Sequence, residues 1–190
     1  MLPEKKYDGY IFDCDGTLAD SMPLHYEAWK YGLSECGALF EFSYELMCSW
    51  GGKSLKGTVD DLNEMFGTSL DHVLVGQVVR HYIKDHLANV KPRREITAIA
   101  HEVACYAKVS VASGGSRRNV ATTLKAIGVD ELFDIVVTAD DVERSKPAPD
   151  LFLLAADKME LRPENCLVFE DSKTGEAAAE AAGMDCVFVG

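Results

Sequence analysis

Two aspartates, Asp13 and Asp15, follow a short apolar run in the segment YIFDCDGTLAD at residues 10–20. Residues i and i+2 of an extended chain point to the same side, so we expect both carboxylates to face one site while Cys14 faces away. Gly16 permits a sharp turn close to a ligand. Such a pair can serve as a nucleophile and an acid–base partner.

Polar residues also follow three later apolar runs. They are Ser113-Gly114-Gly115-Ser116, Lys146 in the loop SKPAPD, and Glu170-Asp171. The hydroxyl of Ser113 and the backbone N–H groups that begin at Gly114 precede a predicted helix, which is a favourable seat for an anion. Lys146 can neutralise a phosphoryl oxygen together with the charge of the nucleophile.

The elements that must position these residues are five apolar runs, rich in Val, Ile and Phe, that barely alternate. The runs are residues 10–12, 109–112, 135–138, 166–169 and 186–189. Such runs are typical of strands buried on both faces. Helical segments separate the last four runs, and Gly128 and Gly183 lie at the expected helix ends. The pattern predicts an α/β fold, a doubly wound parallel sheet with helices on both sides.

In such sheets, ligands bind beyond the carboxyl ends of the strands, so these polar residues should gather at one edge. The carboxylates gathered there are Asp13, Asp15, Glu170 and Asp171. Like charges this close raise one another's pKa values and call for a cation. Carboxylate oxygens suit Mg²⁺, which takes further ligands from water and phosphate. We therefore expect a magnesium site with a phosphorylated ligand.

The segment between the first two predicted strands contains no good strand and has the pattern of helices. The first predicted helix opens after a Ser21 cap, a second covers 55–67, and a third begins after Ser69. We expect residues 1–20 and 90–190 to form the core and residues 21–89 to form an inserted helical domain. The segment KPRRE at 91–95 is predicted to be a solvated helix start.

Four segments then identify a resemblance that covers nearly the whole chain. IFDCDGTLAD, VASGG, SKPAPD and LVFEDSKTG resemble, in order and spacing, the four motifs of the haloacid dehalogenase superfamily of phosphohydrolases. The resemblance implies a Rossmann-like core, and the helical insertion falls where that superfamily places its first type of cap. MPLHYEAW and KPAPDLFLLAADKM look most like the β-phosphoglucomutase and sugar-phosphate phosphatase branch, particularly the compact bacterial fructose-1-phosphate phosphatases.

The resemblance implies roles for single residues. Asp13 would attack phosphorus to form an aspartyl-phosphate, and Asp15 would protonate the leaving alcohol and then activate water. Lys146 would be the catalytic lysine. Mg²⁺ would be held by Asp13, the backbone carbonyl of Asp15, Asp171 and, through water, Glu170.

The inserted domain offers weaker candidates for substrate contacts. His25 and Lys53 match positions that contact substrate in relatives, and Lys56 is a second lysine in the same region. Trp29, on an amphipathic helix, fits substrate contact and core packing equally well. We expect Lys53 or Lys56 to hold a second anionic or hydroxyl-rich part of the substrate.

The expected activity is Mg²⁺-dependent hydrolysis of a small sugar phosphate. A β-phosphoglucomutase is the alternative, but the turn GGKSLKG lacks the arginine that the mutase carries there. A non-catalytic phosphosugar-binding protein is less expected, since it would have lost Asp13 or Lys146. GGKS at 51–54 is no P-loop, because the glycine that this motif needs is replaced by Met47.

Composition narrows the list of partners. The net charge of −12 over 190 residues argues against nucleic acid and anionic membranes, which need a basic face. The six cysteines form no CxxC pair, as expected for reduced thiols. With no signal peptide or membrane span in the pattern, we expect a cytoplasmic monomer.

Overall fold

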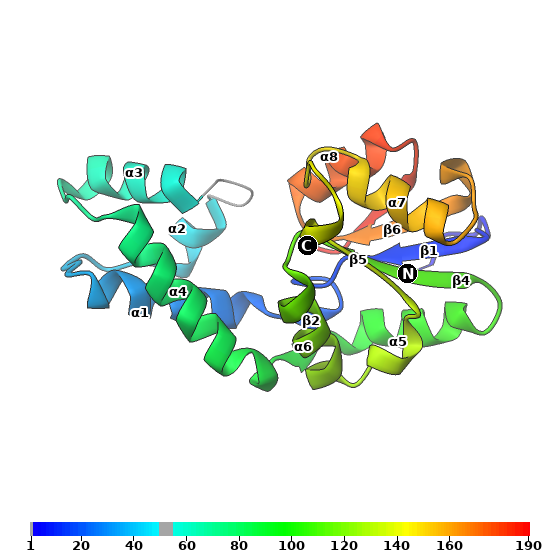
Figure 1. The fold of residues 1–190 in the computed structure, drawn as a ribbon, viewed down its shortest axis with the longest axis horizontal. Helices are drawn as coiled ribbons and strands as arrows, with labels where there is room; N and C mark the ends of the chain where they lie inside the picture. Colours follow the sequence, from blue (N-terminus) through cyan, green and yellow to red (C-terminus); the bar gives the residue numbers. More distant parts are fainter. Residues whose placement is uncertain (1, 50–54) are drawn as a thin grey trace. The chain divides into compact units, whose positions relative to one another are not determined.

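The computed structural model describes residues 2–49 and 55–190 and divides into two compact units. One unit, here called the core unit, comprises Met1–Ser21 and Ala88–Gly190. The other, the helical unit, comprises Met22–Leu87. Both are drawn in Figure 1, and each is described by itself. No helix of the described residues is long and apolar enough to cross a membrane.

The core unit is built on a five-stranded sheet of order β5-β4-β1-β6-β7 in which every pair is parallel. The strands are β1 (Gly9–Phe12), β4 (Lys108–Ser113), β5 (Ile135–Thr138), β6 (Cys166–Glu170) and β7 (Asp185–Phe188). In the central strand, Phe12 lies opposite Val111 on one side and Phe169 on the other. All four residues of β1 are buried, which explains why its sequence does not alternate.

Two pairs of helices cover the two faces of this sheet. They are α5 (Arg94–Ala104), α6 (Arg117–Ile127), α7 (Asp150–Lys158) and α8 (Lys173–Ala181). Figure 1 shows α5 and α6 on one face and α7 and α8 on the other. Ile11 of β1 and Val168 of β6 form one buried cluster with Phe152 of α7 and Ala178 of α8. The doubly wound α/β class predicted from the sequence is confirmed.

Local signals in the sequence fix where these helices end. Ser116 caps the start of α6, where its Oγ accepts a hydrogen bond from the N–H of Asn119. Gly128 ends the same helix at a left-handed φ of 73°, and Gly183 follows α8 at the same φ. Short 3₁₀ turns complete the connections: η1 (Leu87–Asn89), η2 (Asp130–Leu132), η3 (Ala139–Asp141) and η4 (Pro163–Asn165).

A second, two-stranded sheet was not expected from the sequence. β2 (Ala19–Asp20) pairs antiparallel with β3 (Lys91–Pro92) at the two points where the chain leaves and rejoins the core unit. Strands of two residues are too short to show an alternating pattern, so they cannot be predicted from hydrophobic periodicity.

The helical unit packs α4 against α1 and α3. Its helices are α1 (Met22–Glu35), α2 (Tyr44–Ser49), α3 (Leu55–Phe66) and α4 (His72–His86). Leu33, Val59 and Val75 are among the residues that form its buried core. α2 was not predicted, because six residues are too few for a clear helical period.

Two caps predicted for the helices of this unit are wrong. α1 begins directly after Ser21, but the buried Oγ of Ser21 finds no hydrogen-bond partner among the described residues. α4 is capped by Asp71 rather than Ser69, since the Asp71 carboxylate accepts from the N–H of Val73 at 2.7 Å. An Asp two positions nearer the helix is the stronger cap because its acceptor is charged.

Candidate active site

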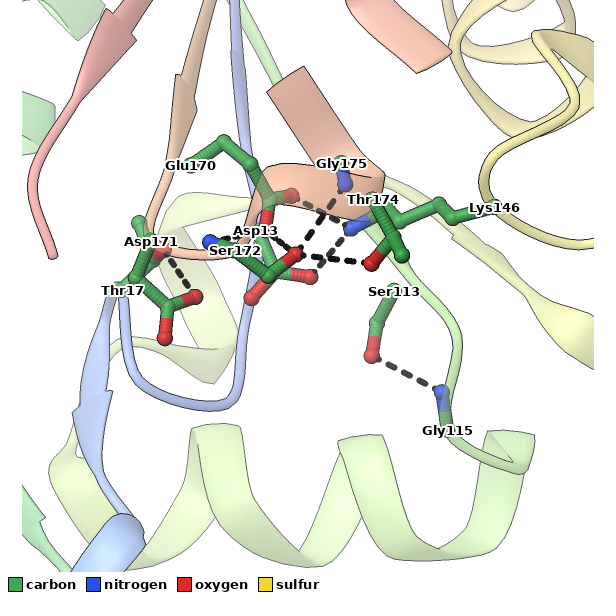
Figure 2. A network of polar contacts seen from close by, with 10 residues as sticks. All are labelled: Asp13, Thr17, Ser113, Gly115, Lys146, Glu170, Asp171, Ser172, Thr174 and Gly175. Carbon is green, nitrogen blue, oxygen red and sulfur yellow. Dashed lines mark hydrogen bonds and ion pairs between the residues drawn. The ribbon is translucent and has the colours of Figure 1, made fainter. Parts of the chain in front are cut away.

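The nucleophile candidate Asp13 lies just beyond β1, where its N–H donates to the Phe169 carbonyl at 3.0 Å and extends the sheet by one residue. Its carboxylate meets Lys146, whose Nζ lies 2.5 Å from Asp13 Oδ1 and 2.7 Å from Glu170 Oε2. These side chains are 7%, 9% and 1% exposed, respectively. Figure 2 shows the three directed at one another from separate segments of the core unit. The lysine is thus placed where it can neutralise charge at the nucleophile.

Burial and charge act in opposite directions on this group of ionisable side chains. Burial raises the pKa of Asp13 well above its usual value; Lys146 opposes the rise and Glu170 adds to it. Burial lowers the pKa of Lys146, but Asp13 and Glu170 together outweigh burial and hold that pKa above its usual value. The ammonium group of Lys146 therefore remains charged across the physiological pH range. The carboxylates beside it lie close to one another.

The crowding defines a candidate cation site. Asp13, Glu170 and Asp171 each offer an oxygen, and these oxygens lie within 4.8 Å of one another, the one such group found among the described residues. Burial, and then the charge of Glu170, raise the pKa of Asp171 to about 6. A divalent cation favours the ionised form of all three groups, and the all-oxygen donor set suits a hard ion. The residues fit a divalent metal.

Ser172 and Gly175 hold Glu170 in place, and the sequence analysis missed both. Ser172 donates to Glu170 Oε1 from its N–H at 3.0 Å and from its Oγ at 2.6 Å. The same Oγ caps α8 by accepting from the N–H of Gly175 at 3.0 Å. A Cβ on Gly175 would overlap the Glu170 carboxylate, so only glycine fits here. The spacing Ser-x-x-Gly within EDSKTG was the available signal.

The turn after Asp13 packs on Asp171 in a similar way. Thr17 is fully buried and its Oγ1 donates to Asp171 Oδ1 at 3.2 Å. Gly16 adopts a left-handed φ of 85°, and a Cβ there would overlap the Asp171 carboxylate. The glycine predicted to allow a close approach is therefore required both by its backbone and by this carboxylate.

The predicted anion seat follows β4. Ser113 is buried, and its Oγ accepts a hydrogen bond from the Gly115 N–H at 3.1 Å. A Cβ built on Gly115 would lie 3.3 Å from Ser113 Oγ and 3.7 Å from Asp15 Oδ2, which places the Asp15 carboxylate beside this turn. A Cβ on Gly114 would lie 3.4 Å from Ser145 Oγ, so the turn also approaches the loop that carries Lys146. Asp15 thus lies on the side of the anion seat and outside the acidic cluster.

An ion pair fixes the far side of this turn. Arg117 Nη2 contacts both carboxylate oxygens of Asp141 at 2.6 Å, and the Arg117 N–H donates to Asp140 at 2.8 Å. The hydrogen bonds from Arg117 lower the pKa of Asp141 to about 2. The Arg117 guanidinium is therefore engaged in an ion pair with Asp141.

Arg93 is a further residue at the site that sequence reasoning missed. Its Nη1 donates to the Gly16 carbonyl at 2.6 Å, its N–H donates to the Leu18 carbonyl at 2.8 Å, and its side chain is only 25% exposed. The helix start predicted for residues 91–95 is confirmed, since α5 begins at Arg94, but Arg93 is not the solvated residue that the prediction made it. No local pattern signals the contact, because it depends on the pairing of β2 with β3.

The residues predicted in the inserted domain are placed differently. His25 is half-buried on α1, and Lys56 pairs with Asp60 at 2.6 Å on the surface of α3. Trp29 packs against the buried core of the helical unit, with its ring centroid 6.1 Å from that of Phe42. Lys53 lies outside the described residues. The structure thus gathers the predicted residues of the core unit, whereas a substrate role for His25 and Lys53 stays a prediction.

Comparison with known proteins agrees with this geometry. The family model described as haloacid dehalogenase-like hydrolase matches residues 10–189. Fructose-1-phosphate phosphatase YqaB of Escherichia coli is 35% identical over 188 residues, which cover 97% of each chain. The β-phosphoglucomutase of Bacillus subtilis is 26% identical over 197 residues, covering 95% of this chain and 82% of the relative.

Solved structures show the same fold. The crystal structure of a conserved haloacid dehalogenase-like protein of unknown function from Agrobacterium tumefaciens matches with a TM-score of 0.85 and 27% identity. The match covers 96% of this chain and 82% of that one. The fold and the site define a phosphohydrolase. The chain belongs to the haloacid dehalogenase-like hydrolases, as the four motifs predict.

Proposed function

We propose that the protein is a Mg²⁺-dependent phosphatase that hydrolyses a small sugar phosphate through an aspartyl-phosphate on Asp13. The observation that carries the proposal is the position of Asp13 Oδ1, 2.5 Å from the buried Lys146 ammonium and within the oxygen cluster of Glu170 and Asp171. A carboxylate so placed has a cation to offset the charge that develops during attack on phosphorus. The names of the phosphatase and mutase relatives support a phosphorylated sugar as the substrate.

The chain's own residues account for each proton and bond. Asp13 Oδ attacks phosphorus while the bond to the alcohol oxygen breaks, and Asp15 gives that oxygen its proton. Asp15 then takes a proton from water as the water oxygen attacks phosphorus, which frees phosphate and the Asp13 carboxylate. Ser113 and the backbone N–H groups after it bind the phosphoryl oxygens, which Lys146 helps to neutralise.

The metal would be held by Asp13, Asp171 and the backbone carbonyl of Asp15, with Glu170 joining through water. Both oxygens of Glu170 already accept hydrogen bonds, from Lys146 and Ser172, which favours an indirect role. When bound, Mg²⁺ neutralises phosphoryl oxygens and keeps the cluster ionised.

We also propose a division of labour between the two units. The core unit carries each residue assigned above to chemistry, so residues 1–20 and 90–190 would form the catalytic domain. The helical residues 21–89 would serve as a cap that selects the sugar, with His25 and Lys53 as contacts.

A β-phosphoglucomutase remains the second candidate because one relative carries that name. Hydrolysis is favoured because the phosphatase relative is matched over 97% of both chains and because the GGKSLKG turn has no arginine. Arginine grips a second phosphate through two parallel hydrogen bonds that lysine cannot reproduce.

A panel of phosphorylated sugars assayed for free phosphate tests the proposal. We expect release of phosphate from a sugar monophosphate in Mg²⁺, no release in EDTA, and little conversion of β-glucose 1-phosphate to glucose 6-phosphate in a coupled dehydrogenase assay. Isomerisation that outruns phosphate release would make the protein a mutase. Full activity in chelator would rule out the metal.

A further inference from the structure

We infer that Arg93 is a positioning residue that fixes the catalytic turn carrying Asp15, an inference that rests on the proposed function. This turn, residues 13–19, closes on itself through two backbone hydrogen bonds: Gly16 N–H to the Ala19 carbonyl at 2.8 Å and Ala19 N–H to the Cys14 carbonyl at 2.9 Å. Neither bond involves the Gly16 carbonyl, which points to the outside of the turn and receives Arg93.

Arg93 donates hydrogen bonds to two carbonyl groups of the turn. Its backbone N–H donates to the Leu18 carbonyl, next to the pairing of Ala19 with Pro92. Its guanidinium donates to the Gly16 carbonyl at 2.6 Å. The peptide bond is planar, so a donor that fixes the Gly16 carbonyl also fixes the N–H of Thr17 in the same plane.

The Gly16–Thr17 peptide lies between two residues of the turn whose side chains lie at the site. On one side is Asp15, whose carboxylate lies beside the Ser113–Gly115 turn. On the other is Thr17, which donates to the metal-cluster residue Asp171. Gly16 is the flexible point between them, since glycine tolerates conformations on both sides of the φ map. The hydrogen bond from Arg93 to the Gly16 carbonyl therefore restricts the backbone at the most flexible residue of the turn.

The chemistry of the side chain suits this task. A hydrogen bond from a charged guanidinium is roughly twice as strong as one between neutral groups. Arg93 Nε is held by Glu95 Oε1 at 3.2 Å, which steadies the guanidinium on the other side. The adjacent Arg94 has the same charge but is exposed, and among the described residues its side chain shows no such contact. Arg94 is thus a matched control.

A loosened turn should affect both steps that use Asp15, but only the first step depends on the leaving group, and kcat/KM reports on that step. If Asp15 is the general acid, its misplacement matters most when the departing oxygen is a poor leaving group that needs a proton. Sugar alcohols are poor leaving groups, whereas p-nitrophenolate departs without one. A residue needed only for the general stability of the fold would not discriminate between these substrates.

The experiment compares Arg93→Ala, Arg93→Lys and Arg94→Ala with the wild type. We expect Arg93→Ala to lower kcat/KM for the best sugar phosphate by about ten- to a hundredfold, because displacing a catalytic group by about 1 Å costs this much. For p-nitrophenyl phosphate we expect a loss of less than about threefold. Arg93→Lys should recover most of the sugar-phosphate rate, since only one N–H reaches Gly16, and Arg94→Ala should match the wild type.

Amide hydrogen exchange provides a readout that does not depend on turnover. In Arg93→Ala the peptide covering residues 13–20 should exchange faster, and in Arg94→Ala it should not. Unchanged exchange in Arg93→Ala, or an equal loss of kcat/KM on both substrates, would overturn the inference.

Asp15→Asn separates this inference from the proposed function. If Asp15→Asn shows no dependence on the leaving group, the assignment of Asp15 as the acid is wrong. If Asp15→Asn discriminates between the substrates and Arg93→Ala does not, the role of Arg93 alone is wrong. A wild type that releases phosphate from no monoester would overturn both.

Discussion

The two units differ in whether they bury a cluster of charged residues. In the core unit Lys146, Asp13 and Glu170 are almost fully buried, and Lys146 and Asp13 are 133 positions apart in the sequence. Among the described residues of the helical unit the ion pairs are exposed and local, as in Lys30 with Glu27 and Lys56 with Asp60. Buried charge is costly and persists only where partners compensate it, whereas an exposed pair contributes about 0–1 kcal/mol.

This contrast distinguishes charged residues that indicate a functional site from charged residues that belong to an ordinary solvated surface. A buried ionic cluster is weak evidence for stability, because well-packed apolar side chains of the same volume are often as stable or more so. Its retention at the strand ends therefore points to chemistry. The exposed pairs of the helical unit carry no comparable signal.

The largest effect should follow Asp13→Asn. The amide cannot form the acyl-phosphate, so we expect phosphate release to fall by at least about 10⁴-fold while the fold is kept. Asp20→Asn, an exposed acid in β2, is the matched control and should retain the wild-type rate. Residual turnover within about tenfold of the wild type would remove Asp13 from the mechanism.

Lys146→Met should show the cost of leaving buried acids without their cation. We expect kcat to fall by about 10³-fold and the free energy of unfolding at pH 8 to fall by about 3 kcal/mol. The stability loss should shrink at pH 5, because the burial-raised pKa of Asp13 then allows the carboxyl to take up a proton. Lys30→Met, which breaks an exposed pair in the helical unit, should cost less than about 1 kcal/mol. Equal costs in the two variants would erase the contrast between the units.

Two glycines refine the same contrast. Gly175→Ala should push the Glu170 carboxylate away and weaken metal affinity by about ten- to a hundredfold, measured as the Mg²⁺ concentration for half-maximal rate. Gly37→Ala in the helical unit has open space around its Cβ but a φ of 85°. It should cost about 1 kcal/mol of stability through the backbone alone and leave metal affinity unchanged. A change in metal affinity in Gly37→Ala would contradict the assignment.

The smallest effect concerns the pH dependence of the metal-free protein. The folded state raises the pKa of Asp171 from 3.8 to about 6, so its proton contributes stability that is complete below pH 4 and lost as pH rises through 6. In EDTA at pH 7.5, Asp171→Asn should therefore be more stable than the wild type. We expect its free energy of unfolding to be higher by on the order of 1 kcal/mol once solvent exposure is allowed for, which a higher unfolding temperature would reveal. The difference should vanish at pH 4, and a variant less stable at pH 7.5 would contradict the raised pKa.

Much of the core unit could be predicted because its signals are local in the sequence. Buried parallel strands leave continuous apolar runs, and Ser116 and Gly128 mark the ends of a helix with their own chemistry. The order of strand-end residues then indicates which side chains meet, since parallel strands bring their carboxyl ends to one edge.

The rest depended on contacts that no local pattern records. β2 and β3 are two residues each and exist only through their pairing, and Arg93 acquires its partner from that pairing. Ser172 and Gly175 matter because of where the Glu170 carboxylate lies. A serine, a glycine or an arginine in a polar segment has many ordinary uses, so residue type alone could not single these out.

The pairing of β2 with β3 also bears on how such a molecule can diversify. Adjacent strands lie about 4.8 Å apart, so the two ends of the 66-residue insertion Met22–Leu87 leave the core unit side by side. Any segment whose own ends lie that close together can be exchanged at this junction without displacing the sheet. If the helical unit selects the substrate as proposed, its replacement at this junction would change the substrate while the sheet that carries Asp13 and Lys146 stays intact.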